Sequence, residues 1–441
     1  MNLKIYLLKL EKRYARFFAA LKMRTVFYFL SDFFMVIQFL KVVVIAPIAF
    51  VSVFMRRLEG TIVMVATRND YIGPCSLQLI SAINAGADRK LVLSVKNRAA
   101  FLKINAELLK VGNFEVYKIV KQDSFSALRL LFQAKGHFAF ETVFETLIAA
   151  NSPRVLFCGG QLPILIPDGV VTKTNGNLIT SSQITKVDLK NKLLGLAAKR
   201  ITYVSQSGVD NYRTCLNHGV RSPSIMRQVG LPRFLRAKNL LDGKTDPILT
   251  RNFLEMIKTD TSSHRIIVAL TKNKESSDFE FFLKQMGLTV AELEDALKES
   301  DVSLWIKSHQ STLPINAGSI DVDYSRQKRI FAIGPADGLS SVDLFSHFDG
   351  LMTDISSIYV DFLPFDKPIG FISYEMWRKQ ERFCYPESPF YPGAKLNTPN
   401  DLRVFLSDLT KDDPQAALER DYARKVLLGD GTDVSFWAEK V

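Results

Sequence analysis

Short apolar runs that alternate with helix-length amphipathic segments constrain the fold of this chain more than any other feature. Five runs in the first half have the length and the β-branched and aromatic content of buried strands. Strands separated by helices form a parallel sheet that helices cover on both faces. The five runs are Thr61–Ala66, Leu91–Val95, Phe114–Tyr117, Val155–Cys158 and Ile201–Val204.

The same pattern begins again after a polar stretch at residues 236–263. A chain of 441 residues is too long for one ordinary core, because domains usually hold about 100–200 residues. We therefore predict an α/β protein with two Rossmann-like, doubly wound domains, at residues 58–236 and 262–430, facing each other across a cleft. Two further helices are predicted at residues 401–409 and 414–428. The strands predicted in the second domain are Arg265–Leu270, Val302–Ile306, Arg329–Ile333, Gly350–Met352 and Pro368–Ile372.

The N-terminal segment, residues 1–57, predicts a helical region that associates with a membrane. Residues 1–24 combine an apolar stripe with seven Lys or Arg, which is typical of a basic amphipathic helix. Residues 25–54 are almost wholly apolar and long enough to span a bilayer, but Asp32 and Lys41 would be costly at its centre. We expect a monotopic or hairpin attachment at the cytoplasmic face of the cell membrane. A true span and a buried core helix remain alternatives.

Charge and cysteine content restrict the partners. The formal net charge of +12 favours anionic partners such as nucleotides, phosphate polymers or acidic lipid surfaces. No aromatic-interleaved RNA-binding motif occurs and the basic residues are dispersed, so nucleic acid is not an expected partner. The four cysteines lack metal-ligand spacing, which indicates free thiols in a reducing compartment and no metal site. No P-loop and no Gly-x-Gly-x-x-Gly sequence occurs, and no cofactor is expected.

The segment Met352–Phe362 carries the clearest signal of a ligand site. An apolar run ends there in a polar cluster and then continues as a helix-like pattern. A helix that follows a strand and begins with Thr, Asp and two Ser offers backbone N–H groups and hydroxyls to a phosphate. The members of this cluster are Thr353, Asp354, Ser356 and Ser357. The alternative is an ordinary helix cap, in which Asp354 only caps its own helix.

Several segments in one order resemble the CDP-glycerol glycerophosphotransferase family, whose members build teichoic-acid and related polyol-phosphate polymers. The family's "TDYSS … FDY" segment, followed by a "PIIFY" strand, is matched by MTDISSIYVDF and the strand after Lys367. Trp305–His309 resembles its "strand, Lys, x, His" segment, and Gly230–Arg233 its "Gly-x-Pro-Arg" turn, with Leu235 where an acidic residue is usual. Tyr391–Gly393 resembles a late Pro-Gly turn. The resemblance covers about residues 150–410 and implies the GT-B fold.

The resemblance also implies roles for particular residues. Lys307 and His309 would offset charge on the departing CMP, the two serines would bind phosphate oxygens, and Asp361 would bind a ribose or polyol hydroxyl. His309 as a structural hydrogen-bonding residue and Lys307 as a solvated side chain are the alternatives. The residues implied in donor binding are Lys307, Gly230, Pro232, Arg233, Thr353, Asp354, Ser356, Ser357 and Asp361.

The family's "Trp-His-Gly … Lys … Gly" element in the N-terminal acceptor domain is matched less closely. The best register places Asp168 where the family has the histidine thought to act as the base, and it keeps Gly169, Lys173 and Gly176. Gly169 and Lys173 would then contact the acceptor. A carboxylate can take a proton from a hydroxyl if its surroundings raise its pKa towards neutrality. The alternative is that Asp168 and Gly169 form only a turn.

The function implied by the resemblance is transfer of a polyol phosphate, with glycerol phosphate expected, from a CDP-activated donor to a hydroxyl. The acceptor would be a cell-surface polyol-phosphate or glycan polymer, or its lipid-linked primer, at a membrane surface. Two alternatives stay open. One is a GT-B glycosyltransferase that uses a nucleotide sugar in capsule assembly. The other is a catalytically silent binding paralogue, which Asp168 and Leu235 favour.

Overall fold

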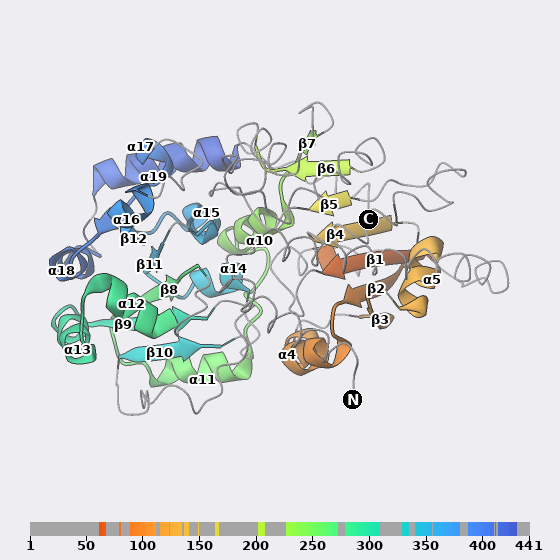
Figure 1. The fold of residues 1–441 in the computed structure, drawn as a ribbon, viewed down its shortest axis with the longest axis horizontal. Coiled ribbons are helices and arrows are strands. Elements are labelled where there is room, and N and C mark those ends of the chain that lie inside the picture. The colour runs from red at the N-terminus through yellow and green to blue at the C-terminus, as the bar shows by residue number, and fades with distance from the viewer. Residues whose placement is uncertain are drawn as a thin grey trace, which may run out of the picture.

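The computed structural model describes residues 61–67, 79–80, 89–111, 115–122, 124–134, 136–140, 149, 164–166, 202–207, 226–271, 278–308, 329–334, 340–354, 356–379, 387–409, 411 and 413–429. Two α/β halves lie side by side, each built on its own parallel sheet (Figure 1). The strand arrows of the two sheets point towards one another, so both sets of carboxyl ends face the middle of the molecule (Figure 1).

The first sheet has seven parallel strands in the order β3-β2-β1-β4-β5-β6-β7. Alternate residues of β1 belong to two different cores: Val63 and Val65 pack with Phe101 of helix α4, whereas Ile62 and Met64 pack with Leu131 of helix α5. The elements are β1 (Thr61–Thr67), β2 (Arg89–Val95), α4 (Arg98–Val111), β3 (Lys118–Lys121), α5 (Phe125–Gln133), β4 (Gly136–Phe140), β5 (Ile164–Ile166), β6 (Thr202–Ser205) and β7 (Met226–Gln228).

The second sheet has six parallel strands in the order β10-β9-β8-β11-β12-β13, which repeats the crossover pattern of the first. Its strands are β8 (His264–Ala269), β9 (Val302–Lys307), β10 (Ile330–Ile333), β11 (Gly350–Thr353), β12 (Ile369–Ile372) and β13 (Ala394–Leu396). Its helices are α12 (Asp278–Met286), α13 (Val290–Glu299), α14 (Ser341–Phe345), α15 (Ile358–Phe362), the 3-10 turn η6 (Leu363–Phe365), α16 (Tyr374–Lys379), α17 (Glu387–Phe390), α18 (Pro399–Ser407) and α19 (Pro414–Leu428). Both sheets therefore have the doubly wound order expected of Rossmann-like units.

Most of the strands predicted from the sequence are confirmed, and the exceptions have local causes. The strand predicted at 114–117 is wrong in its position along the chain. The strand observed there, β3, begins at Lys118 and lies at the edge of the described sheet. The strand predicted at 155–158 lies outside the described residues. Strands β4, β5, β7 and β13 were not predicted, because none of them exceeds five residues and β4 begins with Gly-His.

Both predicted C-terminal helices are present. Helix α19 has the predicted bounds, and the Asp413 carboxylate accepts hydrogen bonds from the N–H groups of Gln415 and Ala416 at its start. Helix α18 begins two residues earlier than predicted, since Pro399 takes its first turn and Thr398 forms a capping box with Asp401. The domain boundaries drawn from the sequence stay a prediction.

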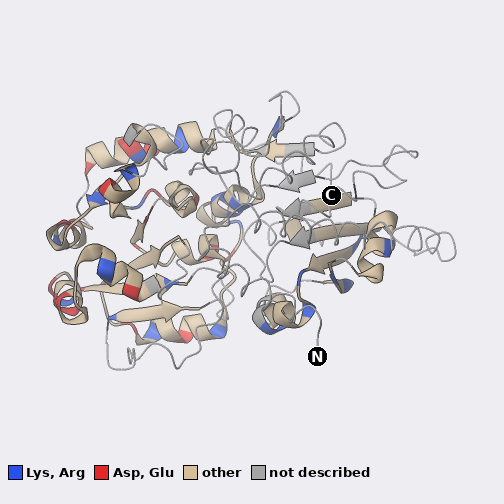
Figure 2. Ribbon diagram, in the orientation of Figure 1, with Lys and Arg blue, Asp and Glu red and all other residues tan. Residues whose placement is uncertain are grey.

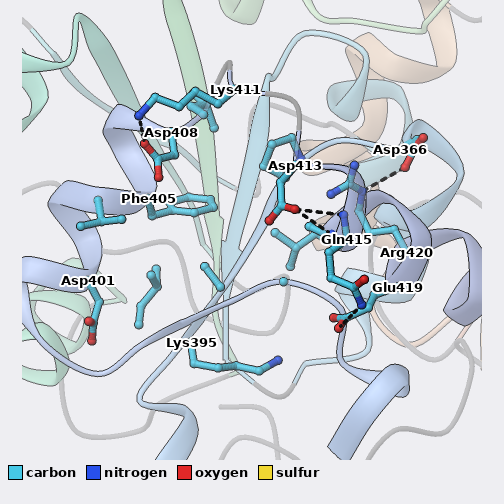
Figure 3. A pocket seen from close by; sticks show the side chains of 18 residues that line it. Asp366, Lys395, Asp401, Phe405, Asp408, Lys411, Asp413, Gln415, Glu419 and Arg420 are labelled. Atoms are coloured by element: carbon cyan, nitrogen blue, oxygen red, sulfur yellow. Dashed lines mark hydrogen bonds and ion pairs between the residues drawn. The ribbon is translucent and has the colours of Figure 1, made fainter.

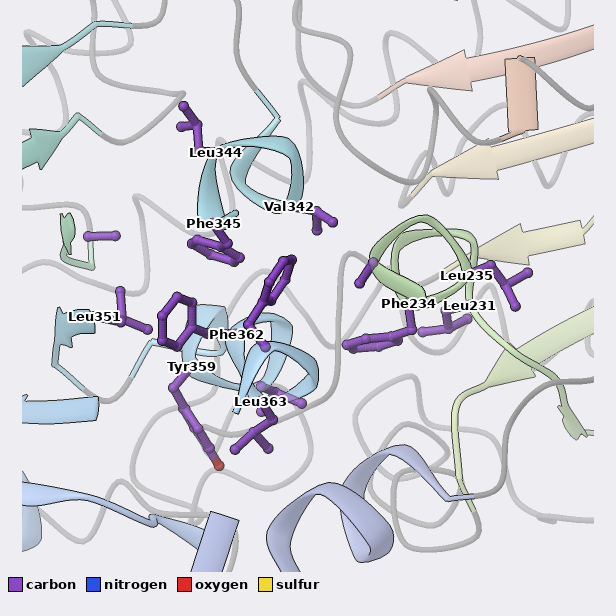
Figure 4. Packing of buried hydrophobic residues seen from close by; sticks show 14 of the residues in the cluster. Leu231, Phe234, Leu235, Val342, Leu344, Phe345, Leu351, Tyr359, Phe362 and Leu363 are labelled. Atoms are coloured by element: carbon purple, nitrogen blue, oxygen red, sulfur yellow. The ribbon is translucent and has the colours of Figure 1, made fainter. Parts of the chain in front are cut away.

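Helix α10 (Pro232–Leu241) follows the last strand of the first sheet, precedes α11 (Arg251–Thr259), and joins the two halves. Its apolar side chains Leu231, Phe234 and Leu235 share one buried cluster with α14, α15 and η6 (Figure 4). The C-terminal end of α19 also lies beside the start of α10. The Gln206 side chain, after β6, accepts from Leu231 N–H at 2.6 Å and donates to Leu428 O at 2.8 Å. The halves are thus packed together through α10.

The late Pro-Gly turn has a clear physical reason for its glycine. Gly393 has φ +144°, and a Cβ added there would lie 2.2 Å from Ile369 O in the neighbouring strand. Only glycine fits this approach of β13 to β12.

The membrane and metal predictions fall mostly on residues that are not described. Residues 1–57 lie outside the described residues, and so do all four cysteines. None of the helices in the described ranges combines the length and the apolar character that a membrane crossing requires. The described ranges also hold no group of three His, Cys, Asp or Glu side chains arranged around a common point.

We predict an acid-sensitive step in stability from His137, which lies in β4 beside Met64 of β1. It is buried, and neither ring nitrogen has a hydrogen-bond partner in the described structure, so burial lowers its pKa to about 4 from 6.5. Below pH 6.5 the unfolded chain binds a proton that the folded chain rejects. Stability should therefore fall as the pH drops from 6.5 to 4, by about 3 kcal/mol in total.

Chemical denaturation of wild type and His137→Leu at several pH values checks this prediction. The wild-type free energy of unfolding should decline more steeply between pH 6.5 and 4 than that of the variant. Parallel pH profiles for the two proteins would contradict the assignment.

Candidate functional site

Most of the sequence-predicted donor residues that the structure describes gather where β9 and β11 end and α10 begins. Lys307 ends β9, Thr353 ends β11, and Arg233 lies in the first turn of α10. Ligands of open α/β sheets bind outside the carboxyl ends of the strands, and here those ends face the other sheet (Figure 1). The chain therefore folds so that segments far apart in sequence meet at one candidate phosphate site.

Arg233 and Asp361 form a buried ion pair between α10 and α15. Arg233 Nη1 donates to Asp361 Oδ1 at 2.9 Å and to Oδ2 at 2.8 Å, and each side chain is only 8% exposed. Burial raises the pKa of Asp361, while the charges of Arg233 and Lys307 act in the opposite direction. The two residues were both predicted to bind the donor. In this structure they bind each other.

Lys307 adds a second cation beside the same carboxylate. It pairs with Ile333 and Ala269 in the sheet register, so it occupies a central strand of the second sheet. Its side chain is almost buried, and its charge acts on Asp361. Lys307 thus places a positive charge at the end of β9, beside the Arg233–Asp361 pair.

The first two polar residues of the signature are used within the protein. The Thr353 hydroxyl donates to Ala269 O at 2.6 Å. The Asp354 carboxylate accepts from Thr271 N–H at 3.0 Å, from the Thr271 hydroxyl at 2.8 Å and from Ser356 N–H at 2.9 Å. Asp354 is fully buried and joins the loop after β8 to the loop after β11. Its carboxylate braces these two loops at the edge of the site.

The two serines of the signature are more exposed than Thr353 and Asp354. Ser356 and Ser357 are half-buried, and Ser357 directly precedes α15 without making a side-chain capping hydrogen bond. The bracing by Asp354 fixes the backbone on which both hydroxyls stand. Of the signature side chains, these two are therefore the ones best placed to reach a phosphate oxygen.

Gly230 and Pro232 set the start of α10 and are both buried. Proline in the first helical turn has no N–H that needs a partner, and its φ is already helical. It therefore fixes where α10 begins, and with it the position of Arg233. Leu235, where the family usually has an acidic residue, is buried in the apolar cluster of Figure 4. An acidic side chain would be costly at that position in this chain.

A second buried ion pair beside the first was not expected from the sequence. Arg236, one turn after Arg233, donates from Nε to Asp343 Oδ1 at 3.2 Å and also from Nη2, and Ile248 N–H donates to the same oxygen at 2.9 Å. Asp343 lies in α14 and is fully buried. The i, i+3 spacing of the two arginines was the available signal, because it places both on one face of α10.

Four of the predicted site residues, Asp168, Gly169, Lys173 and His309, lie outside the described residues. Their roles as base, acceptor ligands and leaving-group partner stay predictions.

A cavity of about 640 Å³ lies at the opposite end of the second sheet, at the amino ends of β12 and β13 (Figure 3). Its charged lining residues are engaged with each other: Arg420 Nε donates to Asp366 at 2.9 Å, and Lys411 pairs with Asp408. Asp413 accepts from the first N–H groups of α19. This cavity is far from the carboxyl ends of the strands and is lined by structural caps and pairs.

The buried pair gives a testable prediction for stability. Removing one partner leaves an uncompensated buried charge, so Arg233→Met and Asp361→Asn should each cost about 3–5 kcal/mol. The double variant should cost less than the sum of the two, because no charge is then left unpaired. Equilibrium unfolding of the four proteins measures the coupling.

The exposed pair Arg378–Glu375 is the matched control, since its side chains are 47% and 46% exposed. Its removal should cost under about 1 kcal/mol. Additive single-variant effects at Arg233 and Asp361 would contradict the coupling.

Comparison with known proteins bears on the same region. Residues 257–429 match the family model described as CDP-glycerol:poly(glycerophosphate) glycerophosphotransferase. The matched range contains Lys307, the signature cluster and Asp361. No curated protein sequence matches the chain.

Solved structures show the fold. The wall teichoic acid polymerase TagF is similar with a TM-score of 0.64 and 17% identity, over 86% of each chain. A variant of TagF soaked with CDPG gives a TM-score of 0.60 and 16% identity, over 86% of this chain and 88% of that one. A co-structure of S. aureus MnaA with UDP gives 0.52 and 12%, over 86% and 94%. The GT-B-like arrangement of two parallel α/β halves is confirmed.

The resemblance seen in the sequence motifs is therefore confirmed where it is most specific, at the second sheet and the signature after β11. Residues 257–429 match the CDP-glycerol:poly(glycerophosphate) glycerophosphotransferase family model, and this match supports a transferase.

Proposed function

We propose that this transferase moves a glycerol-phosphate unit from CDP-glycerol to a hydroxyl at the end of a poly(glycerol phosphate) chain of the teichoic-acid type. The observation that carries the proposal is the family match over residues 257–429, which contains Lys307 and the serine loop at the ends of β9 and β11. The TagF variant soaked with CDPG, which shares the fold, supports a CDP-linked donor.

The donor pyrophosphate is placed, in this proposal, against the carboxyl ends of β9 and β11. Lys307 supplies positive charge, and the Ser356 and Ser357 hydroxyls donate to phosphate oxygens. Arg233 and Asp361 hold α10 and α15 together behind the site. Asp354 keeps the serine loop in place through Thr271.

In the proposed reaction an acceptor hydroxyl attacks the β-phosphorus of CDP-glycerol. A new ester bond forms between the acceptor oxygen and that phosphorus, and the bond from phosphorus to the bridging oxygen breaks. CMP leaves with the bridging oxygen and its negative charge, and the acceptor proton passes to a base. Positive charge fixed beside the departing phosphate stabilises the transition state. We assign that charge to Lys307 and His309, and the base to Asp168.

Attachment to the cytoplasmic face of the cell membrane is part of the proposal. It rests on the basic amphipathic pattern of residues 1–24 and the apolar run that follows. A lipid-linked primer as first acceptor would fit an enzyme held at that surface.

Release of CMP is the direct test of the proposed reaction. Purified protein should release CMP from CDP-glycerol when an acceptor is present, and Lys307→Gln should lower turnover by about a hundredfold. Lys284→Gln, an exposed lysine on α12, is the matched control and should keep wild-type turnover.

CDP-ribitol and a panel of nucleotide sugars complete the assay. Release of nucleotide from a nucleotide sugar alone would identify a glycosyltransferase. No release from any donor, in a protein that still binds CDP-glycerol, would identify a silent paralogue.

The base is tested separately. Asp168→Asn keeps the shape of the side chain and removes its basicity, so donor binding should persist while transfer falls by about two to four orders of magnitude. Asp168→His restores the family's residue and should leave partial activity with a shifted pH profile. Transfer by Asp168→Asn at the wild-type rate would make Asp168 a turn residue.

A further inference from the structure

Four exposed basic residues lie at or just after the carboxyl ends of β2 and β3, the two strands at one side of the N-terminal sheet. Lys96 follows β2, Lys121 ends β3, and Arg98 and Lys103 lie in the first two turns of α4. The register pairs Val95 with Lys121 on neighbouring strands about 5 Å apart, and Lys96 directly follows Val95. We call these four residues the basic edge.

In the parts of the chain that the structure describes, no acidic side chain pairs with the basic edge. None of its four members forms an ion pair within the described parts of the chain. Residues 89–134 carry nine Lys or Arg and three Asp or Glu, so the excess belongs to the whole edge of the sheet.

In the C-terminal half, unlike at the basic edge, exposed ion pairs are common. Several exposed basic residues there pair with nearby carboxylates: Lys258 with Glu255, Arg378 with Glu375, and Lys425 with Asp421. Figure 2 shows the contrast, with blue at β2, β3 and α4 and mixed blue and red along the C-terminal helices. Uncompensated positive charge on one edge attracts an anionic partner.

The position of the basic edge relates it to the candidate site. The carboxyl ends of the first sheet face the second sheet, where Lys307 and the serine loop lie (Figure 1). Charges within about 8–10 Å of one another act together on a nearby ion at physiological salt. Cations spread over two strand ends and a helix suit an extended ligand with repeated charges better than a single phosphate.

We propose that the basic edge binds the polyanionic acceptor, a chain of repeated phosphodiesters, several units away from its reacting end. The inference rests on the proposed function, because the acceptor of the matched family is poly(glycerophosphate). Binding along the edge keeps the polymer attached while its terminal hydroxyl reaches the donor.

A lipid surface fits these residues less well. Faces that bind membranes combine basic residues with large apolar side chains that insert into the acyl region. Near these carboxyl ends the exposed large apolar side chains are Leu102 at 37% and Phe125 at 41%. A third in this part of the chain, Tyr117 at 48%, precedes β3 at its opposite end. The basic edge therefore carries positive charge but little apolar surface that could insert into a membrane.

The test compares two variants that lose the same charge. The edge variant carries Lys96→Gln, Arg98→Gln, Lys103→Gln and Lys121→Gln. The control variant carries Lys258→Gln, Lys284→Gln, Lys298→Gln and Arg403→Gln, all exposed basic residues of the C-terminal half. Fluorescence anisotropy with a labelled poly(glycerol phosphate) oligomer, at several salt concentrations, gives the dissociation constants.

The edge variant should bind the oligomer at least about tenfold more weakly than wild type, and its salt dependence should be shallower by about three units of log–log slope. The control should bind within about twofold of wild type. Equal weakening in both variants would overturn the proposal in favour of general charge attraction. So would an edge variant that keeps the oligomer but loses vesicles of anionic phospholipid.

The binding test is independent of turnover, so its failure is distinct from failure of the proposed function. If CDP-glycerol is not a donor, oligomer binding still decides the role of the edge. If it is a donor, the edge variant should raise KM for a long acceptor about tenfold or more and leave kcat with a one-unit acceptor unchanged. Loss of kcat with the one-unit acceptor would overturn the assignment as a remote binding surface.

Discussion

The buried ion pair between Arg233 and Asp361 is the interaction on which the rest of the site depends. A buried charge is tolerated only when a partner of opposite charge is held in good geometry, and each of these residues supplies that partner for the other. Because Arg233 lies on α10 and Asp361 on α15, satisfying the charges fixes one helix against the other. Arg236 and Asp343 repeat the constraint one turn later. Two pairs on one helix face therefore set how the halves meet.

The chemistry of the site follows from what this constraint leaves available. Arg233 is bound to Asp361 and Asp354 braces two loops, while Lys307 and the two serines lie at the carboxyl ends of β9 and β11. Lysine and hydroxyl side chains are groups that can bind phosphate, and here they stand on rigid supports. The basic edge, whose members form no ion pair within the described residues, adds positive charge along the first sheet, which suits an anionic polymer.

The strands of the two sheets could be predicted from the sequence, whereas most side-chain contacts of the site could not. An apolar run indicates a buried strand, so β1, β2, β8 and β9 could be predicted directly from the sequence. Three-residue strands such as β13 have too few residues to show a pattern. The signature located the serine loop correctly because its polar residues directly follow a strand. The sequence did not reveal that Arg233 pairs with Asp361 across 128 positions, or that Asp354 binds Thr271, since such contacts depend on the assembled fold. His137 was missed because its solitary burial has no local signal.

A crystal structure of the full chain with CDP-glycerol tests the central claim most directly. The account predicts that the donor pyrophosphate lies within hydrogen-bond distance of Lys307, Ser356 and Ser357. It also predicts that Arg233 remains bound to Asp361, as it is without the donor. A complex in which Arg233 leaves Asp361 and binds the pyrophosphate, or in which the donor lies away from the ends of β9 and β11, would contradict it.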